Sequence, residues 1–210
     1  MQQSGRGRKR SEAARAAILR ATRDELLASG YDKLSVDRIA AAAGAGKQTV
    51  YRWYPAKSAL VADCILGGYL LADMWEAPVD EAELGLRDWL RLFAGKAGQP
   101  RAALLIRAAA AASAESDEVA VQLYREVTSV AEAALAGRLR AAGHAGQLPG
   151  GAPVAPLLAQ VLIAAVVHRV LNRLPLTEDF ADDLLGAVTG DIQATPEPAG
   201  PAGTQPASGG

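Results

Sequence analysis

Apolar positions recur with helical periodicity over most of this chain, and the pattern predicts three short helices near the N-terminus. The first spans residues 11–28, where Ser11 is a suitable N-cap and apolar residues share one face. Gly30 can end this helix, because glycine tolerates the left-handed conformation that often follows a helix. The second helix begins after Ser35 and the third after Gly46. We therefore expect a small three-helix unit at this end of the chain.

A longer series of helical segments follows, separated by Pro- and Gly-bearing stretches. The composition supports helices, because Ala, Leu, Arg and Glu dominate over the β-branched residues. The fold class expected is all-α, with an N-terminal three-helix head and a C-terminal helical body. The segments predicted after the head are residues 56–75, 81–97, 100–114, 117–142, 153–173 and 177–192.

The stretch from Ser35 to Leu60 carries the most informative pattern. Its first two helices are joined by Gly44-Ala-Gly46, which permits a tight turn and a close crossing. Charge follows the same division: residues 1–60 hold 12 Lys/Arg and 5 Asp/Glu, a net +7, whereas residues 61–210 carry −8. A basic helix-turn-helix on an acidic body is the arrangement expected of a protein that binds DNA.

The second helix of a helix-turn-helix enters the major groove with its N-terminal residues at the base edges. Lys47 and Gln48 are therefore the expected base contacts, since lysine can donate to guanine O6/N7 and glutamine can pair with adenine N6/N7. Thr49 can touch a thymine methyl group or a phosphate, and Arg52 can serve either purpose. The alternative is that Lys47 and Arg52 are ordinary surface charges.

This region resembles the tetracycline-repressor (TetR) family of bacterial transcription regulators. The resemblance rests on Ile-Ala-x-x-Ala-Gly at residues 39–44 and on Thr-Val-Tyr-Arg-x-Tyr-x-x-Lys-x-x-Leu at residues 49–60. It implies that Tyr51 and Lys57 grip phosphates, together with the amides at the start of the fourth helix. We include the capping Ser35 among the expected DNA contacts. Gly46 stands where many members have serine, but glycine caps a helix at little cost.

Neighbouring side chains of the head leave alternatives open. Trp53 can pack on the core of the head or stack near the DNA backbone, whereas Tyr54 is expected in the core. The arm residues Arg8, Lys9 and Arg10 are either solvated or reach the adjacent minor groove.

The body is expected to make a homodimer, because one head reads only a few base pairs and a twofold axis matches a pseudo-palindromic operator. Segment 153–173 is apolar nearly all round, so one side can pack on its own body and the other on a partner. The alternative is a core helix of a monomer. The expected interface residues are Leu158, Val161, Leu162, Ala165, Val166, Arg169, Leu184 and Val188.

The resemblance also implies a pocket in the body for an unidentified small-molecule effector. The side chains expected to line it can equally be core residues, because a chain with few aromatics uses them to fill space. Arg107 can anchor an acidic group or instead form a surface salt bridge. The candidates are Tyr69, Met74, Trp75, Trp89, Phe93, Arg107 and Tyr124.

Taken together, these features divide the chain into four regions. We expect a disordered basic arm at 1–10, a helix-turn-helix DNA-binding domain at 11–56, a ligand-binding and dimerisation domain at 57–193 and a disordered Pro/Gly-rich tail at 194–210. The function expected is a sequence-specific transcriptional regulator, most simply a ligand-responsive repressor. The alternatives are a helical dimer that binds nucleic acid without sequence preference, or a ligand-binding protein with an inactive head.

Enzymatic, metal-binding and membrane functions are not expected. The two histidines, His144 and His168, lack a carboxylate or cysteine at catalytic or metal spacing. Cys64 is the only cysteine, and it is expected to be a small buried hydrophobe rather than a redox sensor. No signal peptide is expected, and the apolar run around residues 157–167 is interpreted as too short for a bilayer. We expect a cytoplasmic protein that needs no cofactor.

Overall fold

The computed structural model describes residues 4–70, 84–146, 148 and 151–190, with side chains from residue 11 onward. All regular elements in this described part are helical, which confirms the all-α fold. In chain order they are α1 (Ser4–Ser29), α2 (Val36–Ala42), α3 (Lys47–Trp53), α4 (Lys57–Leu66), α5 (Leu86–Gly98), α6 (Pro100–Glu115), α7 (Asp117–Leu123), the π-helical turn η1 (Tyr124–Thr128), α8 (Ser129–His144), the 3-10 turn η2 (Ala152–Val154), α9 (Ala155–Leu171) and α10 (Glu178–Thr189).

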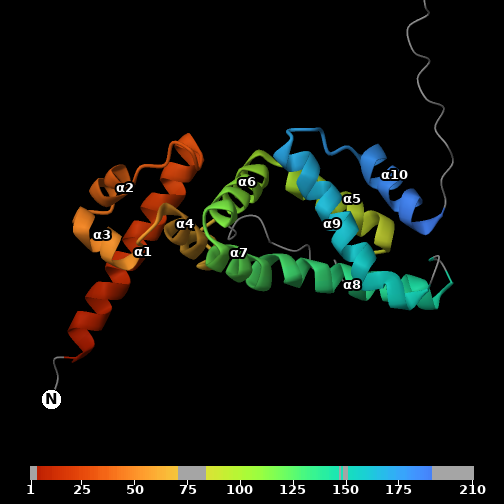
Figure 1. Cartoon of the computed structure of the whole chain (residues 1–210), viewed down its shortest axis with the longest axis horizontal. Helices are drawn as coiled ribbons and strands as arrows, with labels where there is room; N and C mark the ends of the chain where they lie inside the picture. The colour runs from red at the N-terminus through yellow and green to blue at the C-terminus, as the bar shows by residue number, and fades with distance from the viewer. Residues whose placement is uncertain (1–3, 71–83, 147, 149–150, 191–210) are drawn as a thin grey trace, which may run out of the picture.

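The head and the body lie at opposite ends of an elongated molecule (Figure 1). Helices α1, α2 and α3 form the head, and α4 lies beside α1 with α6 and α7 on its other side (Figure 1). Helices α5, α8, α9 and α10 pack together at the far end. Helix α4 therefore contacts both halves.

Two hydrophobic clusters stabilise these halves. The first joins Ile18 of α1, Ile39 of α2, Val50 of α3 and Leu60 of α4 to Leu105 of α6. The second lies within α5, α8, α9 and α10 and includes the buried Leu90, Leu135, Leu139, Leu162 and Val166. Because α4 shares the first cluster with the head, the packing continues across the expected domain limit after residue 56.

Helix α1 begins earlier than the sequence predicts. The expected start at Ser11 is an interior position, because α1 already runs from Ser4 through the stretch expected to be a disordered arm. Extending an existing helix adds one hydrogen bond for each residue ordered, and Arg8, Lys9 and Arg10 all have good helix propensity. These two effects account for the longer helix.

Helix α4 is shorter than the predicted segment 56–75, because it ends at Leu66. Gly68 adopts the left-handed conformation with φ +77°. Its N–H donates to the Ile65 carbonyl at 3.0 Å, and the Tyr69 N–H donates to the Cys64 carbonyl at 3.2 Å. This pair of bonds is the glycine-dependent Schellman stop, which the sequence interpretation overlooked.

The later helices follow the predicted segments, with one interruption. Segment 117–142 contains the π-helical turn at Tyr124–Thr128, which separates α7 from α8. A π-helical turn inserts extra backbone and rotates the side chains that follow it. The exposed face therefore changes direction between the two helices.

The apolar helix near the C-terminus is long enough to span a bilayer, although the sequence analysis interpreted its apolar run as too short. Residues 152–171 form a helical stretch of 20 residues with mean hydropathy 2.0, which is enough to cross a membrane by length and composition alone. One third of that stretch is buried inside the chain. A core helix of a soluble protein passes the same test, and α9 packs along α8 as such a helix does.

Candidate nucleic-acid interface

The turn between α2 and α3 is closed by backbone hydrogen bonds that a left-handed residue makes possible. Gly44 has φ +63°, and the N–H of Ala45 donates to the Ala40 carbonyl at 2.9 Å. The chain then re-enters a helix at Gly46, whose carbonyl accepts from the Thr49 N–H at 2.8 Å. Two short helices thus cross tightly, as the sequence predicts for a helix-turn-helix.

Helix α3 has one buried side and one exposed polar side. Val50 is fully buried against the head core, which fixes the rotation of the helix. Thr49 is half-buried, so it lies at the edge of the exposed side. The exposed side carries Lys47, Gln48, Tyr51 and Arg52. These are the residues expected to meet DNA, and they share one face of a helix that no other described element covers.

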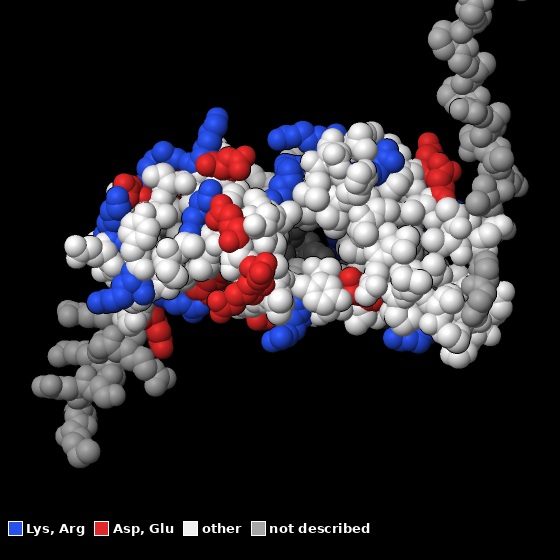
Figure 2. Space-filling view, viewed as in Figure 1, with Lys and Arg blue, Asp and Glu red and all other residues white. Residues whose placement is uncertain are grey.

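Charged side chains gather at the head end of the molecule. Figure 2 shows Lys and Arg spread over α1 to α4, with Asp and Glu between them, while the face over α8 and α9 is largely uncharged. The basic N-terminal part of the sequence therefore also forms a distinct region in space.

Lys47 is paired with a carboxylate of the neighbouring helix. Its Nζ lies 2.7 Å from Oδ1 of Asp37 and 5.8 Å from the ring centre of Tyr51. The bond to Asp37 raises the pKa of Lys47, so the ammonium stays charged. Both side chains are more than half exposed, so water and salt screen the pair and it can be exchanged for another acceptor.

Lys57 begins α4 but points toward the body. Its Nζ lies 3.5 Å from Oε1 of Glu115 at the end of α6 and 4.2 Å from the ring centre of Tyr31. The lysine side chain is only 28% exposed. The residue expected to grip a phosphate is therefore engaged within the chain.

Ser35 acts as the N-cap of α2. Its hydroxyl accepts from the backbone N–H of Arg38 at 3.4 Å, and the residue is half-buried. Arg38 in turn donates from Nε to Glu25 of α1 at 2.8 Å, and this bond lowers the pKa of Glu25. Ser35 thus helps to fix α2 against α1, and its contact with DNA stays a prediction.

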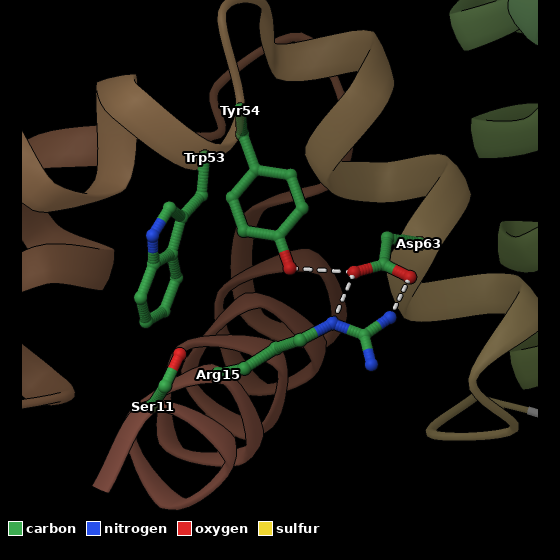
Figure 3. Close-up of a pocket in the computed structure, with 5 residues that line it drawn as sticks. All are labelled: Ser11, Arg15, Trp53, Tyr54 and Asp63. Carbon is green, nitrogen blue, oxygen red and sulfur yellow. Dashed lines mark hydrogen bonds and ion pairs between the residues drawn. The ribbon is translucent and has the colours of Figure 1, made fainter. Parts of the chain in front are cut away.

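A polar cluster that the sequence interpretation missed joins α1 and the end of α3 to α4 (Figure 3). The hydroxyl of Tyr54, just after α3, donates to Oδ2 of Asp63 on α4 at 2.5 Å. The guanidinium of Arg15 on α1 binds the same carboxylate through two nitrogens, with Nε at 3.0 Å. Burial and the Asp63 carboxylate raise the pKa of Tyr54, so the phenol keeps its proton. No sequence spacing signals this cluster, because Arg15 and Asp63 are 48 positions apart.

The cluster lines a shallow pocket of about 370 Å³, together with Ser11 and Trp53. The rings of Trp53 and Tyr54 hang side by side from the end of α3 toward α1 (Figure 3). Tyr54 is buried, as the sequence predicts, and Trp53 is half-buried against the head core. This placement favours the packing interpretation of Trp53 over stacking near DNA.

The candidate ligand-binding side chains lie in different parts of the body. Trp89 is buried and stacks on Phe93, with ring centres 5.2 Å apart, inside the second cluster. Tyr69 packs instead on the head-side cluster. A guanidinium nitrogen of Arg107 donates to the Val170 carbonyl at 3.4 Å. Met74 and Trp75 lie outside the described residues.

Tyr124 is corrected from a pocket residue to a surface residue. Its side chain is 48% exposed, and its hydroxyl donates to Glu132 at 2.9 Å. Tyr124 is the first residue of the π-helical turn, which changes the face that this part of the helix presents.

Two of the expected dimer residues are also corrected. Leu162 and Val166 have no exposed surface, because they lie within the second hydrophobic cluster of their own chain. Val161 is 46% exposed and remains available to a partner. The other expected residues are half-buried, namely Leu158, Ala165, Arg169, Leu184 and Val188.

Metal and thiol chemistry find no support among the described residues. In this part of the chain no three His, Cys, Asp or Glu side chains come together as a metal site would require. Cys64 is fully buried, and its thiol donates to the Leu19 carbonyl at 3.4 Å. Its prediction as a small buried hydrophobe is confirmed.

Comparison with known proteins agrees with this geometry. Residues 18–64 match the family described as bacterial regulatory proteins, tetR family, and residues 80–188 match the one described as tetracyclin repressor-like, C-terminal domain. The uncharacterized HTH-type transcriptional regulator YdeS of Bacillus subtilis (strain 168) is 45% identical over 64 residues, 30% of this chain. The match spans only 32% of YdeS.

Solved structures extend the likeness to the body. The TetR family transcription regulator SCO0332 has a TM-score of 0.58 at 26% identity, covering 85% of this chain and 98% of that one. GusR of Salmonella enterica has a TM-score of 0.59 at 21% identity, covering 84% and 95%, and shares the fold. With a family match over each half and a helix-turn-helix built as the family requires, this chain belongs to the TetR family of transcriptional regulators.

Proposed function

We propose that this regulator binds a pseudo-palindromic operator as a homodimer and that a small molecule weakens this binding. The observation that carries the proposal is the exposed polar face of α3, which a glycine-closed turn presents to solvent. Members of this family are transcription regulators rather than enzymes.

Base recognition is assigned to the first turn of α3. Lys47 and Gln48 are exposed there, and their donors and acceptor suit guanine and adenine edges in the major groove. The Asp37 carboxylate holds Lys47 ready at the helix surface without burying it. When DNA binds, the Lys47 ammonium then exchanges the Asp37 carboxylate for an acceptor on a base edge.

Phosphate contacts position the head. Tyr51 and Arg52 lie on the same exposed side one turn further along α3, where a groove wall would meet them. Lys57 and the backbone amides at the start of α4, which no side chain caps, offer a further anion site. These contacts supply affinity that falls with salt but carries little sequence preference.

The dimer is assigned to an exposed apolar stripe along α9, hereafter the α9 stripe. Its members recur at helical spacing on the side of α9 opposite Leu162 and Val166. Leu157 is 63% exposed, Val161 46% and Leu171 42%, which is unusual for large apolar side chains in a helix this hydrophobic. A twofold contact between two copies covers both stripes at once. The stripe consists of Leu157, Val161, Ala164 and Leu171, and the exposed His168 lies in line with them.

The effector is assigned to the body, and α4 is the element that transmits its effect. Helix α4 packs on α6 and α7 and shares the core of the head, so a displacement in the body shifts the recognition helix. A ligand that prefers the conformation unfit for DNA opposes DNA binding reciprocally. A cytoplasmic location follows from this function.

Selection from a random duplex library at physiological salt tests the proposal. Recovery of an inverted repeat with fixed spacing is the expected result, because two heads related by a twofold axis read two identical half-sites. Weak, salt-sensitive binding without a motif would indicate a nonspecific binder instead. Absence of any DNA binding would show that the head is inactive.

A further inference from the structure

Three residues from distant parts of the chain meet where the head joins the body. Lys57 is the first residue of α4, Tyr31 lies in the loop after α1 and Glu115 is the last residue of α6. The Lys57 ammonium sits 4.2 Å from the Tyr31 ring centre and 3.5 Å from a Glu115 carboxylate oxygen. Tyr31 is buried, so this lysine is held against the head core on one side and by the body on the other.

The position of Glu115 is determined by the corner between α6 and α7. The next residue, Ser116, caps α7 by accepting from the Val119 N–H at 3.3 Å. Val119 belongs to the same core cluster as the head, so the corner is anchored next to α4. The Glu115 side chain itself is 43% exposed, and burial, together with the Glu115 carboxylate, raises the pKa of Tyr31 beside Lys57.

A phosphate bound at the start of α4 would compete with this carboxylate. Both are anions that seek the same ammonium hydrogens, and a carboxylate within a few ångströms of a phosphate repels it. The lysine can neutralise a phosphate fully only when Glu115 is withdrawn.

We infer that Glu115 lowers the affinity of this protein for DNA by holding Lys57 in the body, so that a residue of the body sets how many phosphates the head grips. This inference rests on the proposed DNA-binding function. Glu115 thus acts through Lys57 rather than on DNA itself, and any rearrangement of the α6–α7 corner alters the grip.

Glu115→Gln in the full chain tests the inference, with Glu118→Gln as its control. Glu118 is exposed on the first turn of α7, so the control makes the same chemical change and removes the same charge. The probe is a random-sequence duplex titrated between about 50 and 200 mM salt. Glu115→Gln is expected to bind roughly threefold to tenfold more tightly at low salt, with a salt dependence steeper by about one phosphate contact. Glu118→Gln is expected to keep the wild-type salt dependence.

A double-mutant cycle tests whether Glu115 changes DNA affinity through Lys57. In a Lys57→Gln background, Glu115→Gln is expected to have no further effect on DNA affinity. Equal behaviour of the two glutamate variants, weaker binding by Glu115→Gln, or tightening that persists without Lys57 would each overturn the inference.

Two checks separate this inference from other outcomes. Thermal unfolding of each variant identifies a folding defect, and Glu115→Asp, whose shorter side chain retracts the carboxylate, is then expected to tighten binding by a smaller factor. Failure of the wild-type protein to bind any duplex at low salt would contradict the proposed function. Wild-type binding without a difference between the variants would contradict only the role of Glu115.

Discussion

Individual side chains of the head are held by carboxylates in two different ways. The Lys47–Asp37 pair is exposed on both sides, so solvent screens it and Lys47 can leave for a base edge. In the Arg15–Asp63–Tyr54 cluster, by contrast, one carboxylate of α4 binds a guanidinium from α1 and a hydroxyl from the end of α3. The first arrangement suits a residue that must change partners, and the second suits one that must keep them.

Cys64 gives a direct test of packing at the residue scale. Burial raises the pKa of Cys64 to about 12, so the thiol stays protonated at pH 8. The folded protein is therefore expected to react very slowly with a thiol-specific reagent at pH 8. The same protein unfolded in guanidinium is expected to react at once. The reaction is followed by absorbance, with a reagent that releases a coloured thiolate when it labels a cysteine. Fast labelling of the folded protein would show that this core opens readily.

At the scale of helices, two glycines of α8 differ in how closely they are packed. Gly143 is close to another backbone segment, and Gly137 serves as its control. A Cβ on Gly143 would lie 2.6 Å from the Ala152 nitrogen, a backbone atom that cannot move aside, whereas a Cβ on Gly137 meets nothing within 4 Å. Gly143→Ala is expected to destabilise the protein by about 1–3 kcal/mol in urea unfolding. Gly137→Ala is expected to stabilise it by about 0.5–1 kcal/mol, because alanine favours the helix. Equal effects at both sites would contradict the packing of α8 on η2.

The packing of α3 against α4 includes a hydrogen bond from the Tyr54 hydroxyl to Asp63. Tyr54→Phe removes the donor to Asp63 and keeps the buried ring, so the free energy of unfolding is expected to fall by about 1 kcal/mol. Tyr51→Phe is the matched control, because that side chain is 45% exposed on α3, and it is expected to leave stability unchanged. A Tyr54→Phe protein as stable as wild type would show that the Asp63 cluster does not hold the joint.

Helices were predictable from the sequence because their buried faces repeat along the chain. The periodic apolar positions around Ile18, Ile39 and Val50 predict the head, and all three are fully buried. Helix ends were less predictable: the stop at Gly68 is a single backbone conformation, and no periodicity encodes it. The lengths of α1 and α4 therefore differ from the predictions.

The sequence identifies which residues belong to the candidate site better than it identifies which residues they contact. Motif position identifies Lys47, Gln48 and Lys57, but it cannot tell that Lys57 meets a carboxylate of α6. Such contacts arise only when distant helices pack, as the Asp63 cluster also does. For the same reason, periodicity alone placed Leu162 and Val166 at a dimer interface, since an all-apolar helix does not reveal which side its own chain covers.

At the scale of the whole molecule, the α9 stripe predicts the oligomeric state. The wild-type protein is expected to sediment as a dimer at micromolar concentration. Val161→Glu places a charge in the centre of the stripe and is expected to yield a folded monomer, because burying an unpaired carboxylate in an interface is costly. Val121→Glu, at a residue 55% exposed on α7, is expected to remain dimeric. A wild-type monomer, or a dimer that tolerates Val161→Glu, would contradict this assignment.

Helix α4 unites the molecule, because it shares a core with the head and packs on the body. Its first and last turns carry the polar contacts described above, Lys57 toward Glu115 and Asp63 toward Tyr54. Body and recognition helix are thereby joined through ten residues of α4. This connection is what a regulator needs if events in the body are to reach DNA.

The central claim is that the exposed face of α3 reads base sequence, and the selection experiment repeated with Gln48→Ala tests it most directly. We predict that the variant recovers the same inverted repeat as the wild type, with the preference relaxed at one position in each half-site. The expected loss is about 1–3 kcal/mol of discrimination at that position, because one side chain pairs with one base. A motif and an affinity identical to those of the wild type would contradict the claim.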